Sequence, residues 1–386
     1  MDRIYLDYNA TSPLAPAVKR WLAKGEFVWA NPAAQNSAGK EARARLDEVI
    51  RYLHKTFHLA STTHRVIFHS GATEGINAFF AGLAKGKTLF VFSPLDHSAV
   101  RAQKVRLEQQ GHGALELKVD GDGNLRIAES IALIKERVAQ GGYTQTLVNW
   151  TWVHNETGVV WPLQLALELK MATGALIHVD AVQAPGKVKD WDNLLEELDA
   201  YTFSGHKFGS LKGVGFSFQS LKLMPTPLLL GGGQQEGARS GTENVMGAWS
   251  LQLALEDLKQ SIDPIAQQAY INDLRHWVDQ LLRRKGRRIA AAAQELNLNT
   301  IFIVLDSLPA DLSLPLFDLA GLEVSAGSAC SSGTAKPSAV LLGLGEHKLA
   351  RHGLRLSVSW AFSSDDLQQI KARLKQVLDK IPSLNV

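Results

Sequence analysis

Short apolar segments alternate with longer amphipathic ones from about residue 40 to residue 220, and this alternation constrains the fold more than any other feature. The apolar segments are almost continuously hydrophobic, which is typical of strands buried on both faces of a sheet. Strands are expected at 65–69, 88–92, 146–150, 175–179 and 200–203. Helices are expected at 39–59, 74–85, 98–110, 124–140 and 162–173. Strands and helices in alternation predict an open α/β fold with a mostly parallel sheet flanked by helices.

The pattern changes after about residue 245. Helices are expected at 245–261, 264–285, 311–320 and 364–380, with a single short strand at 300–305. This predicts a second, smaller α+β domain, and 386 residues with 45% hydrophobic content are enough for two cores. The chain is therefore divided into an N-terminal arm (1–14) that packs with the small domain, a large domain (15–250) and a small domain (251–386).

Composition and charge exclude several classes of protein. The net charge of +3 is too small to predict a nucleic-acid-binding face, which needs concentrated basic residues. The basic run 283–288 can bind tRNA or an acidic partner, although such runs are more often solvated helix ends. Apolar segments are too short to span a membrane, and the N-terminus lacks a signal-peptide pattern. With one cysteine, no intrachain disulfide forms. A soluble, cytoplasmic protein is predicted.

Chemically useful side chains follow three of the predicted strands. Lys207 lies just after one strand, and a lysine amine can form a Schiff base when its surroundings lower its pKa. Asp180 follows another strand, where a carboxylate can keep a ring nitrogen protonated, as an electron-sink cofactor such as pyridoxal phosphate requires. The segment 70–74 joins a third strand to a helix, so that its backbone N–H groups and the Thr73 hydroxyl can bind an anion.

Each of these features also has an ordinary explanation. Taken alone, Lys207 is more often an exposed loop lysine and Asp180 more often a helix N-cap, and many strand–helix turns resemble 70–74. Their joint occurrence changes the balance, because ligands of open α/β sheets bind at the edge where parallel strands end. Together they offer a phosphate site, a partner for a ring nitrogen and an imine-forming lysine in one crevice.

The only cysteine of the chain, Cys330, lies in the segment 325–333, which consists of small residues and glycine. This composition is typical of a mobile, exposed loop. Isolated cysteines are usually buried as small hydrophobic residues, but this one has no apolar neighbourhood in the sequence. A reactive thiol is therefore about as well supported as a structural one.

Short motifs occur in order through nearly the whole chain: Tyr5-Leu6-Asp7-Tyr8-Asn9-Ala10-Thr11, Asn31-Pro32, Gly71-Ala72-Thr73-Glu74, His97-Ser98-Ala99-Val100, Asn155-Glu156-Thr157-Gly158, His178-Val179-Asp180-Ala181, Ser204-Gly205-His206-Lys207, Gly231-Gly232-Gly233-Gln234, Arg239-Ser240-Gly241-Thr242-Glu243-Asn244 and the Cys330 segment. With these motifs the chain resembles the cysteine desulfurases of the nitrogen-fixation and iron–sulfur-cluster type, within the class V aminotransferase group. The segment 325–333 resembles the branch with a long cysteine loop. The resemblance implies fold type I of pyridoxal-phosphate enzymes, with the cofactor in the large domain and the cysteine loop in the small one.

The resemblance also implies roles for matching residues. Lys207 would hold pyridoxal 5'-phosphate as an imine, and Asp180 would pair with its ring nitrogen. Cys330 would attack the sulfur of L-cysteine and become a persulfide, leaving L-alanine, while Arg355 would bind the substrate carboxylate. His97 would stack on the ring and assist proton transfer. Gln183 and Asn155 would contact the phenolic oxygen, and Asn155 would also contact the substrate. The phosphate would be bound by Ala72, Thr73, Ser204 and His206, together with Thr242 from the other subunit of a homodimer. No metal site is expected.

The sulfur acceptor is implied only as a class: a scaffold or thiolation enzyme serving iron–sulfur cluster assembly or the thiolation of tRNA or cofactors. The chain departs from the family pattern in three places: at Asn36, where histidine is usual; at Ser210-Leu211, where Gly-Pro is usual; and at Gln235-Glu236, where Glu-Arg is common. None of these positions carries chemistry, but they leave the acceptor and the pathway open.

Three alternatives compete with desulfuration. Plain transamination on the same cofactor needs no thiol, so the cysteine segment argues against it. Selenocysteine cleavage stays open, because such lyases resemble desulfurases closely. A non-catalytic paralogue acting as a scaffold would be expected to lose Lys207, Asp180 or Cys330, and all three are present.

Overall fold

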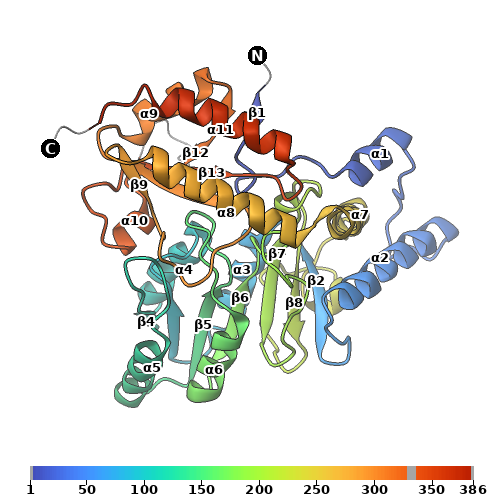
Figure 1. The fold of residues 1–386 in the computed structure, drawn as a ribbon. Helices are drawn as coiled ribbons and strands as arrows, with labels where there is room; N and C mark the ends of the chain where they lie inside the picture. Colours follow the sequence, from blue (N-terminus) through green and yellow to red (C-terminus); the bar gives the residue numbers. More distant parts are fainter. Residues whose placement is uncertain (1–2, 328–335, 384–386) are drawn as a thin grey trace.

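The computed structural model describes residues 3–327 and 336–383. Within these residues the largest element is a seven-stranded sheet in the order β2-β8-β7-β6-β5-β3-β4 (Figure 1). Every pairing in it is parallel except those of β8, which runs antiparallel to both its neighbours. The strands are β2 (His64–His69), β3 (Thr88–Phe92), β4 (Gly113–Glu116), β5 (Gln145–Thr151), β6 (Leu176–Asp180), β7 (Ala200–Ser204) and β8 (Gly215–Ser220). The predicted α/β class with a mostly parallel sheet is confirmed.

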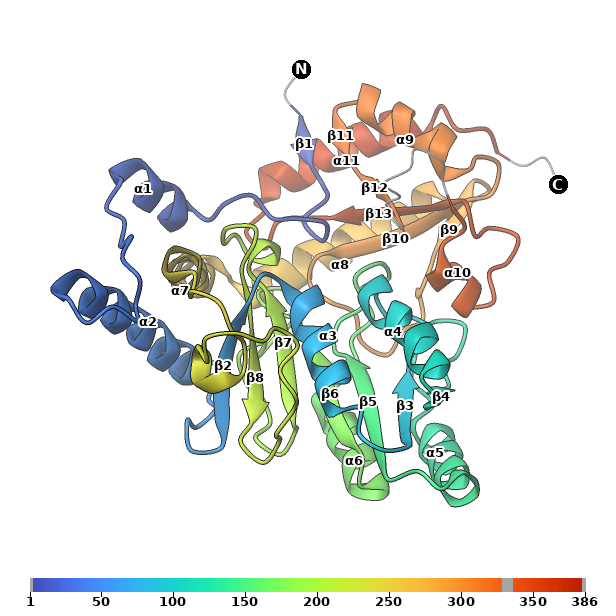
Figure 2. The same ribbon diagram turned by 180° about the vertical axis from the view of Figure 1, so that it is seen from behind.

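The large sheet is buried on both faces. In β3, Leu89 and Val91 belong to one core cluster and Phe90 and Phe92 to another, because alternate side chains of a strand point to opposite faces. Figure 2 shows α3 and α4 in front of the sheet, on the side of Phe90. The cluster on this face contains residues of α3 (Ala72–Leu83) and α4 (Ser98–Gln109). The other cluster contains residues of five helices: α1 (Pro16–Lys24), α2 (Ser37–Thr56), α5 (Ile127–Gly141), α6 (Leu163–Thr173) and α7 (Val245–Ser261).

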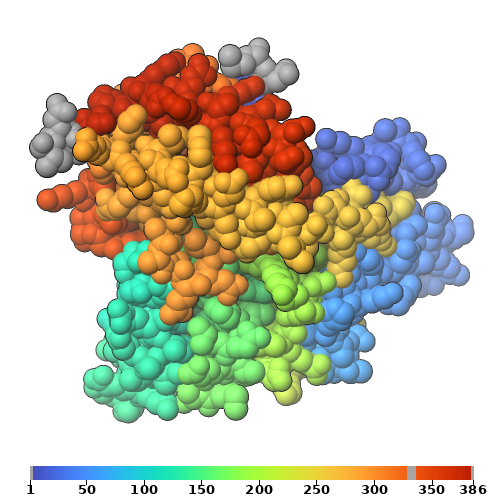
Figure 3. Space-filling model, viewed as in Figure 1, coloured from blue at the N-terminus to red at the C-terminus, as the bar shows by residue number. Residues whose placement is uncertain are grey.

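A smaller antiparallel sheet in the order β12-β13-β10-β9 has a core cluster of its own. Helices α8 and α11 contact each other beside it, and Figure 3 shows them lying together on one surface of the molecule. The N-terminal β1 pairs in parallel with β11. The remaining elements are β1 (Ile4–Tyr5), α8 (Pro264–Leu281), β9 (Gly286–Arg288), β10 (Thr300–Leu305), α9 (Ala310–Leu319), β11 (Leu322–Glu323), β12 (Ser325–Ala326), α10 (Ala339–Gly343), β13 (Gly353–Ser357) and α11 (Ser364–Leu378). The division of the chain after residues 14 and 250 stays a prediction.

The basic run 283–288 follows α8 and is partly engaged within the chain. Arg287 forms an ion pair with Glu346 (2.6 Å), and Arg288 forms one with Asp279 (2.9 Å). The run is therefore not a helix end: it lies in the turn after α8 and in strand β9. Binding of a partner by this run stays a prediction. Across the described residues, no helix combines the length and the apolar character that crossing a membrane requires.

Candidate active site

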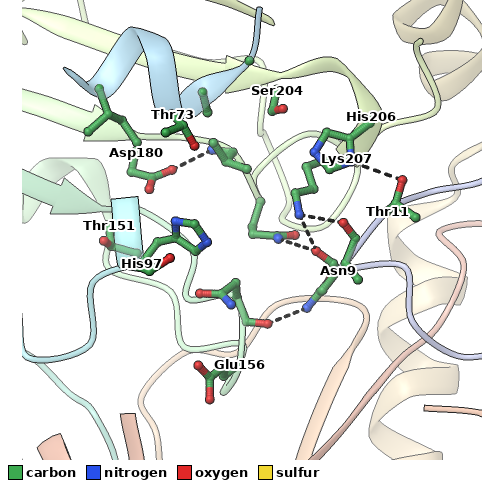
Figure 4. A pocket seen from close by; sticks show the side chains of 18 of the residues that line it. Asn9, Thr11, Thr73, His97, Thr151, Glu156, Asp180, Ser204, His206 and Lys207 are labelled. Carbon is green, nitrogen blue, oxygen red and sulfur yellow. Dashed lines mark hydrogen bonds between the residues drawn. The ribbon is translucent and has the colours of Figure 1, made fainter. Parts of the chain in front are cut away.

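A cavity of about 950 Å³ lies where the parallel strands of the large sheet end. Its wall includes the last residues of β5, β6 and β7, as expected for an open α/β sheet. Figure 4 shows the side chains of Lys207, His97 and Asp180 directed into it. The site residues predicted from the sequence that line the cavity are Ala72, Thr73, His97, Asn155, Asp180, Gln183, Ser204, His206, Lys207 and Arg355.

Lys207 ends a short 3-10 turn that follows β7 directly. Its Nζ donates hydrogen bonds to the carbonyl oxygens of Asn9 (2.9 Å) and Ala10 (2.8 Å). Burial lowers the pKa of this amine to about 8, and the positive charge of Arg355 acts in the same direction. A lysine held this way loses its proton more readily than an exposed one and can attack a carbonyl carbon. The alternative of an exposed loop lysine is wrong.

Asp180 is the last residue of β6 and is buried. Its Oδ1 accepts a hydrogen bond from the backbone N–H of Val182 (3.1 Å), and the residues that follow form turns rather than a helix, so the helix N-cap interpretation is wrong. Burial raises the pKa of this carboxyl to about 6. A cation placed against it would favour its charged form. The side chain therefore fits a partner such as a protonated ring nitrogen.

The N-terminus of α3 also lines the cavity. The helix begins at Ala72, two residues earlier than predicted, and places Thr73 in its first turn. Gly71 is the N-cap and has no side chain to bond the first N–H groups, which can therefore bind an anion. A Cβ added to Gly215 on β8 would lie 3.0 Å from Gly71 Cα, so glycine there permits the close approach of this strand.

Two further groups at the end of β7 complete the predicted phosphate end. Ser204 is buried at the end of the strand, and its Oγ would lie 3.8 Å from a Cβ built on Gly71. His206 Nδ1 lies 3.1 Å from the Thr11 hydroxyl. Burial and the neighbouring Lys207 lower the pKa of His206 to about 4, so the ring is neutral near pH 7. A hydroxyl and a neutral imidazole both suit hydrogen bonding to phosphate oxygens.

His97 caps the N-terminus of α4, where its Nδ1 accepts a hydrogen bond from the N–H of Ala99 (3.2 Å). Because Nδ1 is an acceptor, the proton of the neutral ring is assigned to Nε2. Burial, together with the positive charges of Lys207, Arg101 and Arg355, lowers the pKa of His97 to about 4. The cavity therefore contains a neutral imidazole near pH 7.

Arg355 on β13 reaches the cavity from the smaller sheet. Its Nη2 donates to Asp7 Oδ1 (2.7 Å) and to Ser325 Oγ (2.8 Å), and its Nη1 donates to the Asn155 carbonyl (3.2 Å). Its Nε is buried and has no hydrogen-bond partner among the described residues. Arg355 lines the cavity, and its guanidinium has more N–H donors than these three bonds use, which fits the binding of a carboxylate.

Two predicted site residues differ from the others. Thr242 is exposed and is not among the described residues that line the cavity. Its role at the phosphate of a neighbouring subunit stays a prediction.

Cys330 lies outside the described residues, but Gly327 and Lys336, on either side of the segment 328–335, both line the cavity. The chain therefore enters and leaves the cysteine segment at the wall of the cavity.

Asp96, next to His97, was missed in the sequence. It is fully buried, and its Oδ1 accepts hydrogen bonds from Thr151 Oγ1 (2.6 Å) and Asn149 Nδ2 (2.9 Å). Burial raises the pKa of its carboxyl to about 7. The signal that identified Asp180, an acid just beyond a buried strand, applies to Asp96 as well.

Comparisons with known proteins agree with this geometry. The family model described as Aminotransferase class-V matches residues 4–370. A cysteine desulfurase of Cereibacter sphaeroides is 34% identical over 100% of this chain and 98% of that relative, and one of Gluconacetobacter diazotrophicus is 32% identical over 100% and 94%. The X-ray structure of a NifS-like protein from Rickettsia africae superimposes with a TM-score of 0.84 at 24% identity, over 98% of this chain and 99% of that one, which supports the fold.

Proposed function

We propose that this chain, which belongs to the aminotransferase class-V family, is a cysteine desulfurase that uses pyridoxal phosphate to convert L-cysteine to L-alanine. The observation that carries the proposal is one cavity containing a partly buried lysine of lowered pKa, a buried carboxylate and a helix N-terminus without a side-chain cap. Full-length relatives named cysteine desulfurases support the same reaction.

Bound pyridoxal phosphate would supply an electron sink for the substrate. Lys207 would hold it covalently, and Asp180 would hold a proton on its ring nitrogen. The N–H groups of Ala72 and Thr73 would bind its phosphate, together with Ser204 and His206. Gln183 and Asn155 would donate to its phenolic oxygen. All of these residues line the same cavity, so a single bound molecule can meet them together.

The remaining residues would act on the substrate. Arg355 would bind the carboxylate of L-cysteine, and His97, neutral near pH 7, would assist proton transfer. The Cys330 thiolate would attack the substrate sulfur: the new S–S bond forms, the substrate C–S bond breaks, and its electron pair stays on the carbon skeleton. Protonation of that carbon gives alanine, while the persulfide passes its outer sulfur to an acceptor.

Subunit and partner assignments extend the proposal. The protein would act as a homodimer in the cytoplasm, and the exposed Thr242 of one subunit would reach the phosphate held by the other. The acceptor would be a scaffold or thiolation enzyme of iron–sulfur cluster assembly or of tRNA or cofactor thiolation.

The test of the proposed function is direct. The purified protein should absorb visible light through its cofactor, the spectrum should change on addition of L-cysteine, and alanine and sulfide should form in the presence of a reducing agent. A protein that is reconstituted with pyridoxal phosphate, remains folded and forms no alanine from L-cysteine would contradict the proposal.

Asp180→Ala should lower kcat at least about 100-fold, the lower end of the range for groups that control protons in a reaction. The reason is that the ring nitrogen would lose the negative charge that keeps it protonated. Steady-state alanine formation measures the effect at full cofactor occupancy. Asp180→Asn is the matched control, because it keeps the shape but not the charge and should be slowed similarly. Near-normal rates in both variants would refute the role.

Arg355→Ala should raise KM for L-cysteine about 10- to 100-fold, because a charge-assisted contact with the substrate carboxylate is lost. Arg355→Lys should rescue poorly, since a point charge does not replace the planar guanidinium. The cofactor absorption of both variants should match that of the parent. Cysteamine, which lacks the carboxylate, provides the check: if the parent binds it as tightly as L-cysteine, the assignment is wrong.

A further inference from the structure

Lys187 is buried with 0% of its surface exposed, in the turns that follow β6. Burial lowers the pKa of its amine well below the usual value; Lys207 and Arg355 act in the same direction, and Asp7 opposes them. Burying an amine costs free energy unless a hydrogen bond compensates, whereas methionine or leucine would fill the same space without a polar group. Among the described residues, the hydrogen-bond partner of Lys187 Nζ is Gln183 Oε1. The amine therefore acts on the side chain of Gln183.

The orientation of the Gln183 amide follows from two contacts. Its Nε2 donates to the carbonyl oxygen of Asn9 (2.9 Å), and a carbonyl can only accept, so the nitrogen end faces Asn9. The oxygen end then needs a donor, which Lys187 provides. Lys207 Nζ donates to the same Asn9 oxygen (2.9 Å), and Figure 4 shows the hydrogen bonds that converge on Asn9. The NH2 group of Gln183 thus lies beside the amine of Lys207.

We propose that Lys187 is a positioning residue that fixes the Gln183 amide so that its NH2 group, not its oxygen, faces the phenolic oxygen of the cofactor. This inference rests on the proposed function. In pyridoxal phosphate the phenolic oxygen is on the ring carbon next to the one that carries the aldehyde, so it lies near the lysine that attaches there. An NH2 group has two N–H donors, and the bond to Asn9 uses one of them. A flipped amide would present its oxygen to the phenolate and destabilise it.

Lys187→Met tests the proposal, because it keeps the apolar stem and removes the donor. The readout is the pH titration of the visible absorption of the bound cofactor. A phenolate without its donor holds a proton more tightly, so the midpoint should rise by at least about half a pH unit, a threefold change in proton affinity. The dissociation constant of the cofactor should rise about tenfold, the scale of one charge-assisted hydrogen bond. Lys187→Gln, which retains an N–H donor, should lie closer to the parent.

Two controls separate orientation from packing. Gln183→Met should shift the midpoint as Lys187→Met does, and the double variant should shift no further than Gln183→Met alone, because both changes remove one interaction. Leu298→Ala, beside the backbone carbonyl of Lys187, should lower the melting temperature and leave the midpoint unchanged.

An unchanged midpoint in Lys187→Met, or additive shifts in the double variant, would overturn the assignment of Lys187 while the parent remains an active desulfurase. A parent protein that shows no cofactor absorption would instead contradict the proposed function. If Lys187→Met does not fold, the titration of Lys187→Gln decides. A midpoint of Lys187→Gln near that of the parent, with a large shift in Gln183→Met, supports the role of Lys187. A shift in Lys187→Gln as large as that in Gln183→Met overturns it.

Discussion

Lys207→Ala should lose the covalent link to the cofactor and lower the turnover of L-cysteine about a thousandfold or more, the scale of covalent and proximity effects. The amine is held in the cavity by the Asn9 and Ala10 carbonyls and has its pKa lowered to about 8, so it is prepared to attack an aldehyde. The methyl side chain of alanine has no nucleophile, so it cannot form the covalent link. Reduction with borohydride followed by mass spectrometry should attach the cofactor to the parent and not to the variant.

Lys212→Ala provides the matched control, because Lys212 also lines the cavity. This variant should still be labelled on Lys207 by the same reduction. If Lys207→Ala turns over cysteine like the parent, or if the label in the parent is found on Lys212, the central assignment of the site is wrong.

The strands of the large sheet were predictable where their apolar character is continuous, as in β3 and β5. Strand β8 was not predicted, although Phe216 and Phe218 alternate with Ser217 and Gln219, a period typical of a strand with one exposed face. Those polar side chains are nevertheless buried, and the Ser217 hydroxyl lies 3.1 Å from the Thr202 hydroxyl. The burial of Ser217 could not be predicted, because the hydroxyl that it contacts, that of Thr202, belongs to another strand. Helix α8 ends at Leu281, short of the predicted 285, and Arg284 just beyond it has a positive φ of 67°.

The candidate site was predictable wherever a reactive residue directly follows a strand, because the parallel sheet gathers such positions at one edge. Lys207, Asp180 and Thr73 come together in this way. The supporting contacts were not predictable, because they join distant parts of the chain. Asn9 accepts hydrogen bonds from both Lys207 and Gln183, and nothing in its own neighbourhood indicates this. The assignment of Thr242 rests on resemblance alone.

Cys330→Ser should abolish desulfuration while leaving the cofactor in place, an effect as large as that of Lys207→Ala. The cofactor can labilise protons of cysteine, but the sulfur must be accepted by a nucleophile, and Cys330 is the only thiol in the chain. Gly327 and Lys336, the described residues on either side of its segment, both line the cavity. Ser331→Ala is the control for changes to the segment itself and should retain activity.

Mass spectrometry gives the decisive measurement for Cys330. After reaction with L-cysteine, the parent should gain one or more sulfur atoms, removable by a reducing agent, on the peptide that contains Cys330, and Cys330→Ser should gain none. An active parent that never carries extra sulfur would exclude the persulfide route. The same variant separates desulfuration from selenocysteine cleavage, since selenium is a better leaving group and can depart without that thiol. Selenocysteine turnover that survives Cys330→Ser, with cysteine turnover lost, would identify the thiol as specific to sulfur transfer and leave the lyase activity to the cofactor site alone.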